Sequence, residues 1–317
     1  MPVPAIHPLT LEDRRWLEPL LLANCASGDP LAAYSFPYHF IWQGLFRYEW
    51  MELAGHRCLL AGNQEGSFLA LPPLGPDPGG SATTQAFAFL ADRNRNPALT
   101  RIENTPESLA NRCRAQGYRV VPKGADYLYQ RDALVGLHGD RYKGQRVSYN
   151  HCVKGSRPMF RAFRPEDIGA CLDLFRQWQQ GVKQNGASDL ARHLAADAES
   201  AHRTGIHYAA ELGLVGRVVE IEGRVAAYTF GYPLTSTSPS PLLQGRGEGE
   251  GAVFCILFEI ADRTVKGLSQ FIFRELCREL EGYELINTMD DSGLEGLRRA
   301  KLAYNPLRLI ESYIVSP

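Results

Sequence analysis

RPEDIGACLDLFRQW, residues 164–178, decides the fold, because it repeats a plan found near the start of the chain. There, residues 10–25 read TLEDRRWLEPLLLANC. Each stretch places two acidic residues in a first helical turn and then spaces apolar residues at the helical period. Thr10 with Asp13 is typical of a capping box, and Pro165 suits a first helical position. We therefore predict an amphipathic helix early in each half of the chain.

A predicted β-hairpin follows each of these helices. In the first half, residues 57–61 and 67–71 flank a turn at 64–66, and in the second half residues 217–222 and 225–232 flank Gly223. Short β-rich runs around a glycine turn are the hairpin signal.

A third phrase also recurs later in each half. The helix that ends in CRAQGY (113–118) precedes a strand-like run at 119–121, and the helix that ends in CRELEGY (277–283) precedes one at 284–287. Acidic helix starts and glycine helix ends are common, so chance is the alternative. Three elements in the same order favour duplication. Because residues 155–158 read as a linker, we predict domains at 1–155 and 156–317, the first structural or shaping the acceptor site.

Residues 235–251 do not belong to this plan. They are rich in Ser, Pro and Gly, with alternating Gly and Glu at the end. Such a composition buries little apolar surface. We predict a flexible surface insertion without a catalytic role.

The composition is that of a globular protein without a global charge. The chain has 317 residues, of which 44% are hydrophobic and 22% charged, and its formal net charge is -1. This balance argues against broad nucleic-acid binding. No signal peptide and no run of about 18 apolar residues occurs, so we expect a cytoplasmic protein. The seven cysteines form no C-x-x-C pair, and we expect most of them to be small core residues in a reducing compartment.

Several stretches resemble one family. They are DYLY (126–129), LVGLHGDRYKGQR (134–146), KGLSQ (266–270), DDSGLEGLR (290–298) and KLAYNP (301–306), with YSF (34–36) and IW (41–42) earlier. Together they resemble the phosphatidylglycerol lysyltransferase C-terminal-domain family in its short form. The resemblance implies an α+β or α/β fold of two tandem GNAT-like (acyl-CoA N-acyltransferase-like) domains, each a mixed sheet flanked by helices. Membrane-bound members move an aminoacyl group from tRNA to a lipid headgroup, and peptidoglycan-bridge aminoacyltransferases share the double fold.

A first candidate site lies where a predicted strand, a glycine turn and a helix meet. Backbone N–H groups at a helix N-terminus bind anions. The resemblance implies a coenzyme A pyrophosphate loop with a Q/R-x-x-G-x-G/A pattern here, and Gly267 fits it better than Thr264 and Ser269 do. We predict anion binding by Arg263, Lys266, Gly267 and Ser269. The alternative is an ordinary helix start after a tight turn.

A second candidate site is the basic stretch from His138 to Arg157, which holds Asp140 as its only acid. Basic side chains neutralise phosphates, and interleaved aromatic rings stack on bases. We predict that Arg141, Lys143 and Arg146 contact a phosphorylated donor or the acceptor end of a tRNA. A solvated helical face is the alternative.

The third candidate site is catalytic and lies near the C-terminus. Transfer to an amine needs a proton acceptor and groups that stabilise an oxyanion. We assign the first role to Asp290 or Asp291, which follow a predicted strand, and the second to Lys301 or Arg308. The resemblance includes Lys301 and the Tyr304-Asn305-Pro306 sequence. The alternative is that Asp291 caps a helix whose last carbonyls Lys301 and Arg308 bind.

Other chemistry is not expected. The spacing of His193 and His202 fits no zinc signature, and no hydrolase or P-loop motif occurs, so we predict no metal and no tightly bound cofactor. The sequence therefore predicts a transferase that moves an acyl or aminoacyl group from acyl-CoA or aminoacyl-tRNA to an amine or hydroxyl acceptor. A non-catalytic ligand-binding module on the duplicated fold is the second hypothesis.

Overall fold

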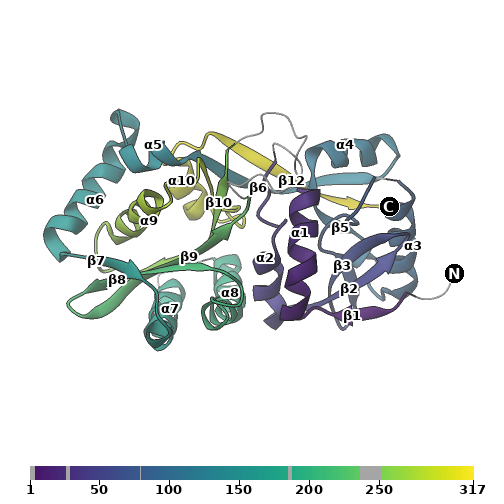
Figure 1. The fold of residues 1–317 in the computed structure, drawn as a ribbon, viewed down its shortest axis with the longest axis horizontal. Coiled ribbons are helices and arrows are strands. Elements are labelled where there is room, and N and C mark those ends of the chain that lie inside the picture. Colours follow the sequence, from purple (N-terminus) through teal and green to yellow (C-terminus); the bar gives the residue numbers. More distant parts are fainter. Residues whose placement is uncertain (1–3, 26–28, 79, 185–187, 236–250) are drawn as a thin grey trace. The chain divides into compact units, whose positions relative to one another are not determined.

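The order of helices and strands occurs twice along the chain. The computed structural model describes residues 4–25, 29–78, 80–184, 188–235 and 251–317 (Figure 1). The first series is β1 (Ile6–Pro8), α1 (Arg14–Asn24), α2 (Phe36–Phe40), β2 (Arg47–Leu53), β3 (His56–Asn63), β4 (Gly66–Leu69), α3 (Ser81–Arg93), β5 (Ile102–Pro106), α4 (Glu107–Ala115) and β6 (Arg119–Gln130).

The second series has the same order. After the helices α5 (Arg131–Gly136) and α6 (Lys143–Ser156), it consists of β7 (Met159–Ala162), α7 (Ile168–Gln184), α8 (Asp189–His207), β8 (Val215–Ile221), β9 (Arg224–Pro233), β10 (Val253–Ala261), α9 (Leu268–Glu279), β11 (Leu285–Asn287), α10 (Glu295–Leu302) and β12 (Arg308–Ser316). Each described strand and α-helix of the first series thus has a counterpart in the second.

The acidic phrases start both early helices in the same way. The backbone N–H of Thr10 donates to Asp13 Oδ2 at 2.8 Å, and that of Arg164 donates to Asp167 Oδ2 at 2.8 Å. In each case a single 3-10 turn precedes the α-helix. A carboxylate three residues into the helix therefore binds a backbone donor that has no partner within the helix. Both predicted helices are confirmed.

Both predicted hairpins exist, but they are not counterparts in the two series, since β8–β9 corresponds to β2–β3. β3 pairs antiparallel with β4, and β8 pairs antiparallel with β9. The two residues between β8 and β9, Glu222 and Gly223, have φ angles of 51° and 75°. Positive φ at both central residues is what a two-residue hairpin turn requires, and Gly223 adopts it without steric cost.

The chain forms two compact units that do not coincide with the two series. Unit 1 holds the described residues up to Asp126 together with Ile310–Pro317, and unit 2 holds the described residues from Tyr127 to Leu309. The predicted division at residue 155 follows the repeat of elements, because the second series begins at β7. The compact units differ from it because β6 and β12 each pass from one unit into the other.

Each unit therefore completes its sheet with the last strand of the other series. The strand order is β1-β2-β3-β4-β5-β12-β6 in unit 1 and β6-β11-β10-β9-β8-β7 in unit 2. β5 pairs antiparallel with β12, and β11 pairs antiparallel with β6. Two parallel pairs, β4–β5 and β10–β11, occupy equivalent places in the two sheets.

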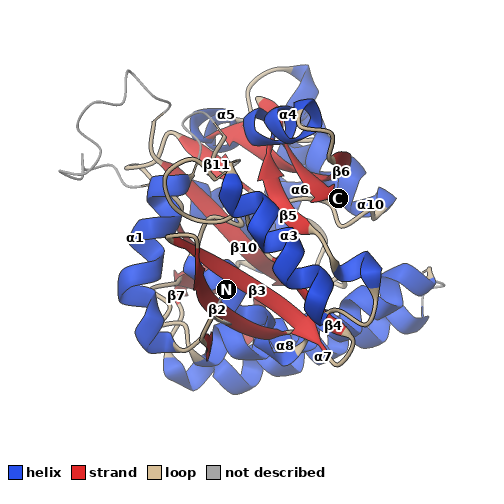
Figure 2. Ribbon diagram, turned by 90° about the vertical axis from the view of Figure 1, so that its right-hand side faces the viewer, coloured by secondary structure: helices blue, strands red, loops and turns tan. Residues whose placement is uncertain are grey.

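Helices cover both faces of each sheet. In unit 2, Phe175 of α7 packs with Tyr228 and Phe230 on one face, while Phe271 of α9 packs with Ala227 on the other. Figure 1 shows α7 and α9 on opposite sides of β9. In unit 1, α3 and α4 pack on the face that includes Met51, and Trp16 of α1 meets Trp50 on the opposite face. Figure 2 shows α3 in front of the strands of unit 1. The mixed sheets with flanking helices confirm the predicted fold class.

The third recurring phrase is not at equivalent positions, and this prediction was wrong. CRAQGY (113–118) covers the end of α4 and precedes β6, whereas CRELEGY (277–283) covers the end of α9 and precedes β11. The counterpart of β11 is β5, and there the sequences do match: residues 102–105 read IENT and residues 285–288 read LINT. The predicted insertion at 235–251 lies, except for its two end residues, outside the described residues.

Candidate functional site

The loop after β11 brings together three of the four predicted catalytic residues. The Lys301 ammonium donates to the backbone carbonyl oxygens of Thr288 at 2.6 Å and Met289 at 3.0 Å, and also to that of Asp290. An ammonium has three N–H donors, so these three carbonyls account for all of them. Lys301 therefore fixes the path of the loop that carries the two aspartates.

Both carboxylates in this loop also bind backbone groups. Asp290 Oδ1 accepts from the Ser292 N–H at 3.0 Å, and Asp291 Oδ1 accepts from the Gly293 N–H at 3.0 Å. Hydrogen bonds that an Asp side chain accepts from the backbone N–H two residues later in the chain are typical of tight turns. Both side chains are half-buried, so they remain within reach of solvent.

Tyr127 on β6 joins the same cluster. Its hydroxyl donates to Asp291 Oδ2 at 2.6 Å, and the Lys301 Nζ lies 5.4 Å from the centre of its ring. Burial and the hydrogen bond to Asp291 raise the pKa of Tyr127 to about 12. The sequence indicates this residue through the alternation of aromatic and apolar residues at 126–129, but that pattern gives no sign of its partner.

The fourth predicted residue, Arg308, is the first residue of β12. It is half-buried, and the adjacent Leu307 N–H donates to the Leu128 carbonyl of β6 at 2.7 Å. Arg308 therefore lies at the start of β12, directly after the loop that follows α10.

The predicted anion site at the start of α9 is a tight, acid-capped turn. Asp262 Oδ1 accepts from the N–H and the hydroxyl of Thr264, at 2.9 and 2.7 Å. Gly267 has a φ of 84°, and a Cβ there would lie 1.9 Å from the Ser148 carbonyl oxygen of α6. Close packing on α6 explains this glycine without a ligand.

The other predicted anion-binding residues near α9 point to different surroundings. The Arg263 guanidinium lies 5.4 Å from the centre of the Trp178 ring, and Lys266 and Ser269 are exposed. Anion binding by Arg263, Lys266, Gly267 and Ser269 stays a prediction.

A pocket of about 400 Å³ lies beside this turn and is lined by acidic side chains. Its wall includes Asp167, Asp173, Glu220 and Asp262, with Arg224 as its cation. Negative walls repel a pyrophosphate, whose charge has the same sign. The pocket therefore offers no support for a coenzyme A phosphate site at this place.

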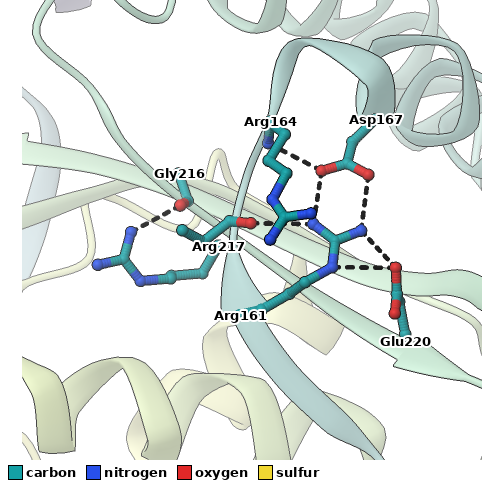
Figure 3. Close-up of polar contacts among 7 residues, drawn as sticks. Arg161, Arg164, Asp167, Gly216, Arg217 and Glu220 are labelled. Carbon is teal, nitrogen blue, oxygen red and sulfur yellow. Dashed lines mark hydrogen bonds and ion pairs between the residues drawn. The ribbon is translucent and has the colours of Figure 1, made fainter.

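Two of these acids are held by one arginine (Figure 3). Arg161 donates to both oxygens of Asp167 at 2.7 Å and, through Nε, to Glu220 Oε1 at 2.9 Å. Asp167 is 7% exposed, and its hydrogen bonds with Arg161 hold its pKa below the usual value. This network fastens β7 and the start of α7 to β8.

The basic stretch forms an exposed helical surface. Lys143, His151, Lys154 and Arg157 are exposed on or directly after α6, and the α6 sequence contains no acidic residue. Arg146 instead donates to the carbonyls of Leu137 and Gly139, and the Arg141 guanidinium lies 5.1 Å from the centre of the Tyr142 ring. Of the three predicted residues, Lys143 has the most freedom to meet a phosphate.

Three further findings concern the described residues. No helix among them is both long and apolar enough to cross a membrane. No group of three or more His, Cys, Asp or Glu side chains within the described ranges is arranged to hold a metal ion. All seven cysteines are buried, as predicted, and none of them forms a disulfide.

Two series with the same order of elements, and two units that each hold a mixed sheet between helices, place the chain in the class of tandem GNAT-like folds. The chain belongs to the family described as phosphatidylglycerol lysyltransferase, C-terminal, whose profile matches residues 32–316. No curated protein matches the sequence.

Three solved structures resemble the chain over nearly its whole length. A conserved protein of unknown function from Bacteroides thetaiotaomicron is 21% identical with a TM-score of 0.78, and the alignment covers 99% of both chains. L-PGS from Bacillus licheniformis is 14% identical with a TM-score of 0.61, covering 95% of this chain and 90% of that one. FemX is 9% identical with a TM-score of 0.55, covering 98% and 96%. At these identities the likeness concerns the fold.

Proposed function

We propose that the chain is a transferase that moves an aminoacyl group from a charged tRNA to an amine. The observation that carries this proposal is the match of residues 32–316 to a lysyltransferase family, which includes the loop held by Lys301. The same match favours a transferase over a non-catalytic binding module. Acyl-CoA is the second donor that we consider, a hydroxyl is the second acceptor, and the cytoplasm is the proposed location.

The surroundings of the two candidate donor sites support tRNA ahead of acyl-CoA. The turn before α9 is capped by Asp262 and adjoins an acidic pocket, which disfavours a pyrophosphate. The surface of α6 is basic and free of acids, which favours the phosphates of a nucleic acid. We therefore place the tRNA acceptor end near Lys143 and Lys154.

Within the catalytic cluster, we propose a positioning role for Lys301. Its three donors are bound to carbonyls, so it serves the reaction by fixing the loop at Asp290 and Asp291. The proton-accepting role of Asp290 or Asp291 and the oxyanion-stabilising role of Arg308 stay predictions, which Asp290→Asn and Arg308→Met test. Each variant should lower kcat about 100-fold if the role is correct.

A donor assay tests the proposed function. Purified protein is incubated with total tRNA charged with radiolabelled amino acids, or with acetyl-CoA, and a mixture of primary amines as acceptors. We expect label to move from tRNA to an amine. Consumption of acetyl-CoA alone would reject the donor, and binding of tRNA without transfer from either donor would favour the binding module.

Charge-reversal variants test the tRNA surface. Each lost phosphate contact weakens binding and lowers its salt dependence, so Lys143→Glu with Lys154→Glu should weaken tRNA binding about 10-fold or more. Arg203→Glu, on the exposed side of α8, is the control. It reverses one positive charge, whereas the double variant reverses two. Equal affinity of the double variant and the control would exclude α6 as the tRNA surface.

A further inference from the structure

Two buried oxygens without a hydrogen-bond partner lie side by side in unit 2. Among the described residues, Thr229 Oγ1 on β9 and Glu259 Oε2 on β10 are both shielded from solvent and unpartnered. Thr229 stands opposite Glu259 in the antiparallel register, and such pairs have Cβ atoms about 4.5–5.5 Å apart. Buried polar groups in native structures are almost always hydrogen-bonded, so two adjacent exceptions require an explanation.

Both side chains face α9. Ala227 and Ala261, two residues away on the same strands, belong to the cluster formed with Leu268, Phe271 and Ile272 of α9. Residues two apart on a strand share a face of the sheet. The unpartnered oxygens therefore lie on the α9 side of β9 and β10, and Thr229 is 0% exposed there.

Among the described strands, none pairs with β10 at Glu259 on the side away from β9. Pairing of β10 with β11 stops at Cys255 and Asn287, whereas β10 continues to Ala261. Glu259 thus has a strand neighbour on one side, and the residue as a whole is partly exposed while Oε2 is buried. A ligand bound at this carboxyl would therefore displace no described strand of the sheet.

The surroundings keep the carboxyl neutral at pH 7. Burial raises the pKa of Glu259 to about 8. The titratable groups that it influences are Cys277 on α9 and Tyr304 after α10, and burial raises the pKa of both above their usual values. Arg274 on α9 acts on Tyr304 and lowers its pKa, in opposition to the burial effect. Glu259 is therefore the group in this cluster that titrates near neutral pH.

We propose that Glu259 and Thr229 form the amine-binding site of unit 2, in which Glu259 accepts the proton of the bound amine. A protonated primary amine has three N–H donors, so it can satisfy Oε2 of Glu259 and Oγ1 of Thr229 together. A charged amine also supplies the partner that an ionised carboxylate needs when it is buried.

As a step in transfer, this inference rests on the proposed function. The bound ammonium gives one proton to the Glu259 carboxylate and becomes a neutral amine. Its nitrogen lone pair forms a bond to the acyl carbon of the aminoacyl-tRNA, and the ester C–O bond breaks. A second proton of the nitrogen passes to the leaving ribose oxygen. A proton acceptor with a pKa near the working pH is the efficient choice.

Calorimetry with n-propylamine tests the binding site without any donor. At pH 7 a carboxyl with a pKa of about 8 is about 90% protonated, so binding of the ammonium should release about 0.9 proton, and at pH 9 about 0.1. The number of protons follows from titrations in buffers of different ionisation enthalpy. 1-Propanol, which has no charge, should release none.

Variants separate the two side chains. Glu259→Gln keeps the shape of the neutral acid, so the protein should fold, and both amine binding and proton release should be lost. Thr229→Val should weaken binding about 3- to 10-fold and leave the proton release per bound amine unchanged. Glu279→Gln, at an exposed end of α9, is the control and should behave as the natural sequence does.

The outcomes distinguish this inference from the proposed function. If the amine binds without releasing protons, or binds equally to the Glu259→Gln variant, the site is refuted whether or not transfer occurs. If binding and proton release follow the prediction but no donor supports transfer, the site stands and the proposed function fails. In an active preparation, kcat/KM should rise with pH up to about 8, and the Glu259→Gln variant should lack this rise.

Discussion

Replacing Lys301 by Met should loosen the loop at Thr288–Asp290 while leaving the rest of unit 2 intact. The ammonium donates to three successive carbonyls, and Met keeps the apolar stem but none of the donors. Hydrogen bonds that involve a charged group contribute about 1.5–3 kcal/mol each in favourable settings. The side chain is half-buried and the freed carbonyls can bind water, so we expect a total loss of about 3 kcal/mol, which is the upper value for a single such bond.

Hydrogen exchange measures this loss at the loop itself. The N–H of Gly293 is bound to Asp291 Oδ1 and that of Leu294 to the Asp291 carbonyl, so both report on the loop. A local loss of about 3 kcal/mol should speed their exchange about 100-fold, because 1.4 kcal/mol corresponds to a factor of about 10.

Lys266→Met is the matched control, since Lys266 is exposed beside α9. A surface change of this kind should alter stability by less than about 0.5 kcal/mol. Exchange at Gly293 and Leu294 that is as slow in Lys301→Met as in the control would refute the positioning role of Lys301.

Three further changes test the packing. Gly267→Ala should destabilise unit 2 by about 3 kcal/mol or more in urea unfolding, because the left-handed φ and the overlap with the Ser148 carbonyl both cost energy, and Gly144→Ala, in open space on α6, should have little effect. Arg161→Met should cost about 3 kcal/mol, since Asp167 would stay buried without its cation, and adding Asp167→Asn should recover part of the loss; an unchanged midpoint for the single variant would contradict the network in Figure 3. Burial lowers the pKa of His39 in unit 1 and of His202 in unit 2 to about 3. As the pH falls from 6.5 toward 3, each histidine is therefore protonated in the unfolded chain before it is protonated in the folded unit. The free energy of unfolding of each unit should then fall by about 1.4 kcal/mol per pH unit. His202→Phe should remove this slope for unit 2, and an equal slope in the variant would exclude His202 as its cause.

Local signals allowed the elements to be predicted well. Asp13 and Asp167 bind the backbone at the starts of their helices, and this interaction needs only three residues of sequence. The turn at Glu222 and Gly223 is similarly local. Leu268, Ile272 and Leu276 of α9 recur at the helical period and are buried, because this period decides which residues share a face of the helix.

Long-range pairing could not be predicted from the sequence. Nothing in residues 310–316 indicates that they pair with β5, because a strand's own pattern does not name its neighbour. For the same reason, the sequence did not show that CRAQGY (113–118) and CRELEGY (277–283) lie on elements that are not counterparts. The matching IENT and LINT stretches indicate the repeat more reliably than the third phrase does. IENT lies on β5, which pairs in parallel with β4, and LINT lies on β11, which pairs in parallel with β10.

The roles of single charged residues depended on the same tertiary information. Lys301 carries the charge expected for an oxyanion stabiliser, but the path of the backbone at 288–290 gives its donors three carbonyls. Glu259, by contrast, could have been noticed, because it is the acid within the apolar run VFCILFEIA of β10. An acid in such a run needs a partner or a raised pKa.

The placement of β12 has a consequence for synthesis of the protein. In unit 1, residues 310–316 separate β5 from β6, although they leave the ribosome after all of unit 2. During translation the edge of β5 that later pairs with β12 therefore has no partner strand, and an unpaired strand edge favours association with other chains. Unit 1 can close only after translation has passed α10, so the half made first is the half finished last.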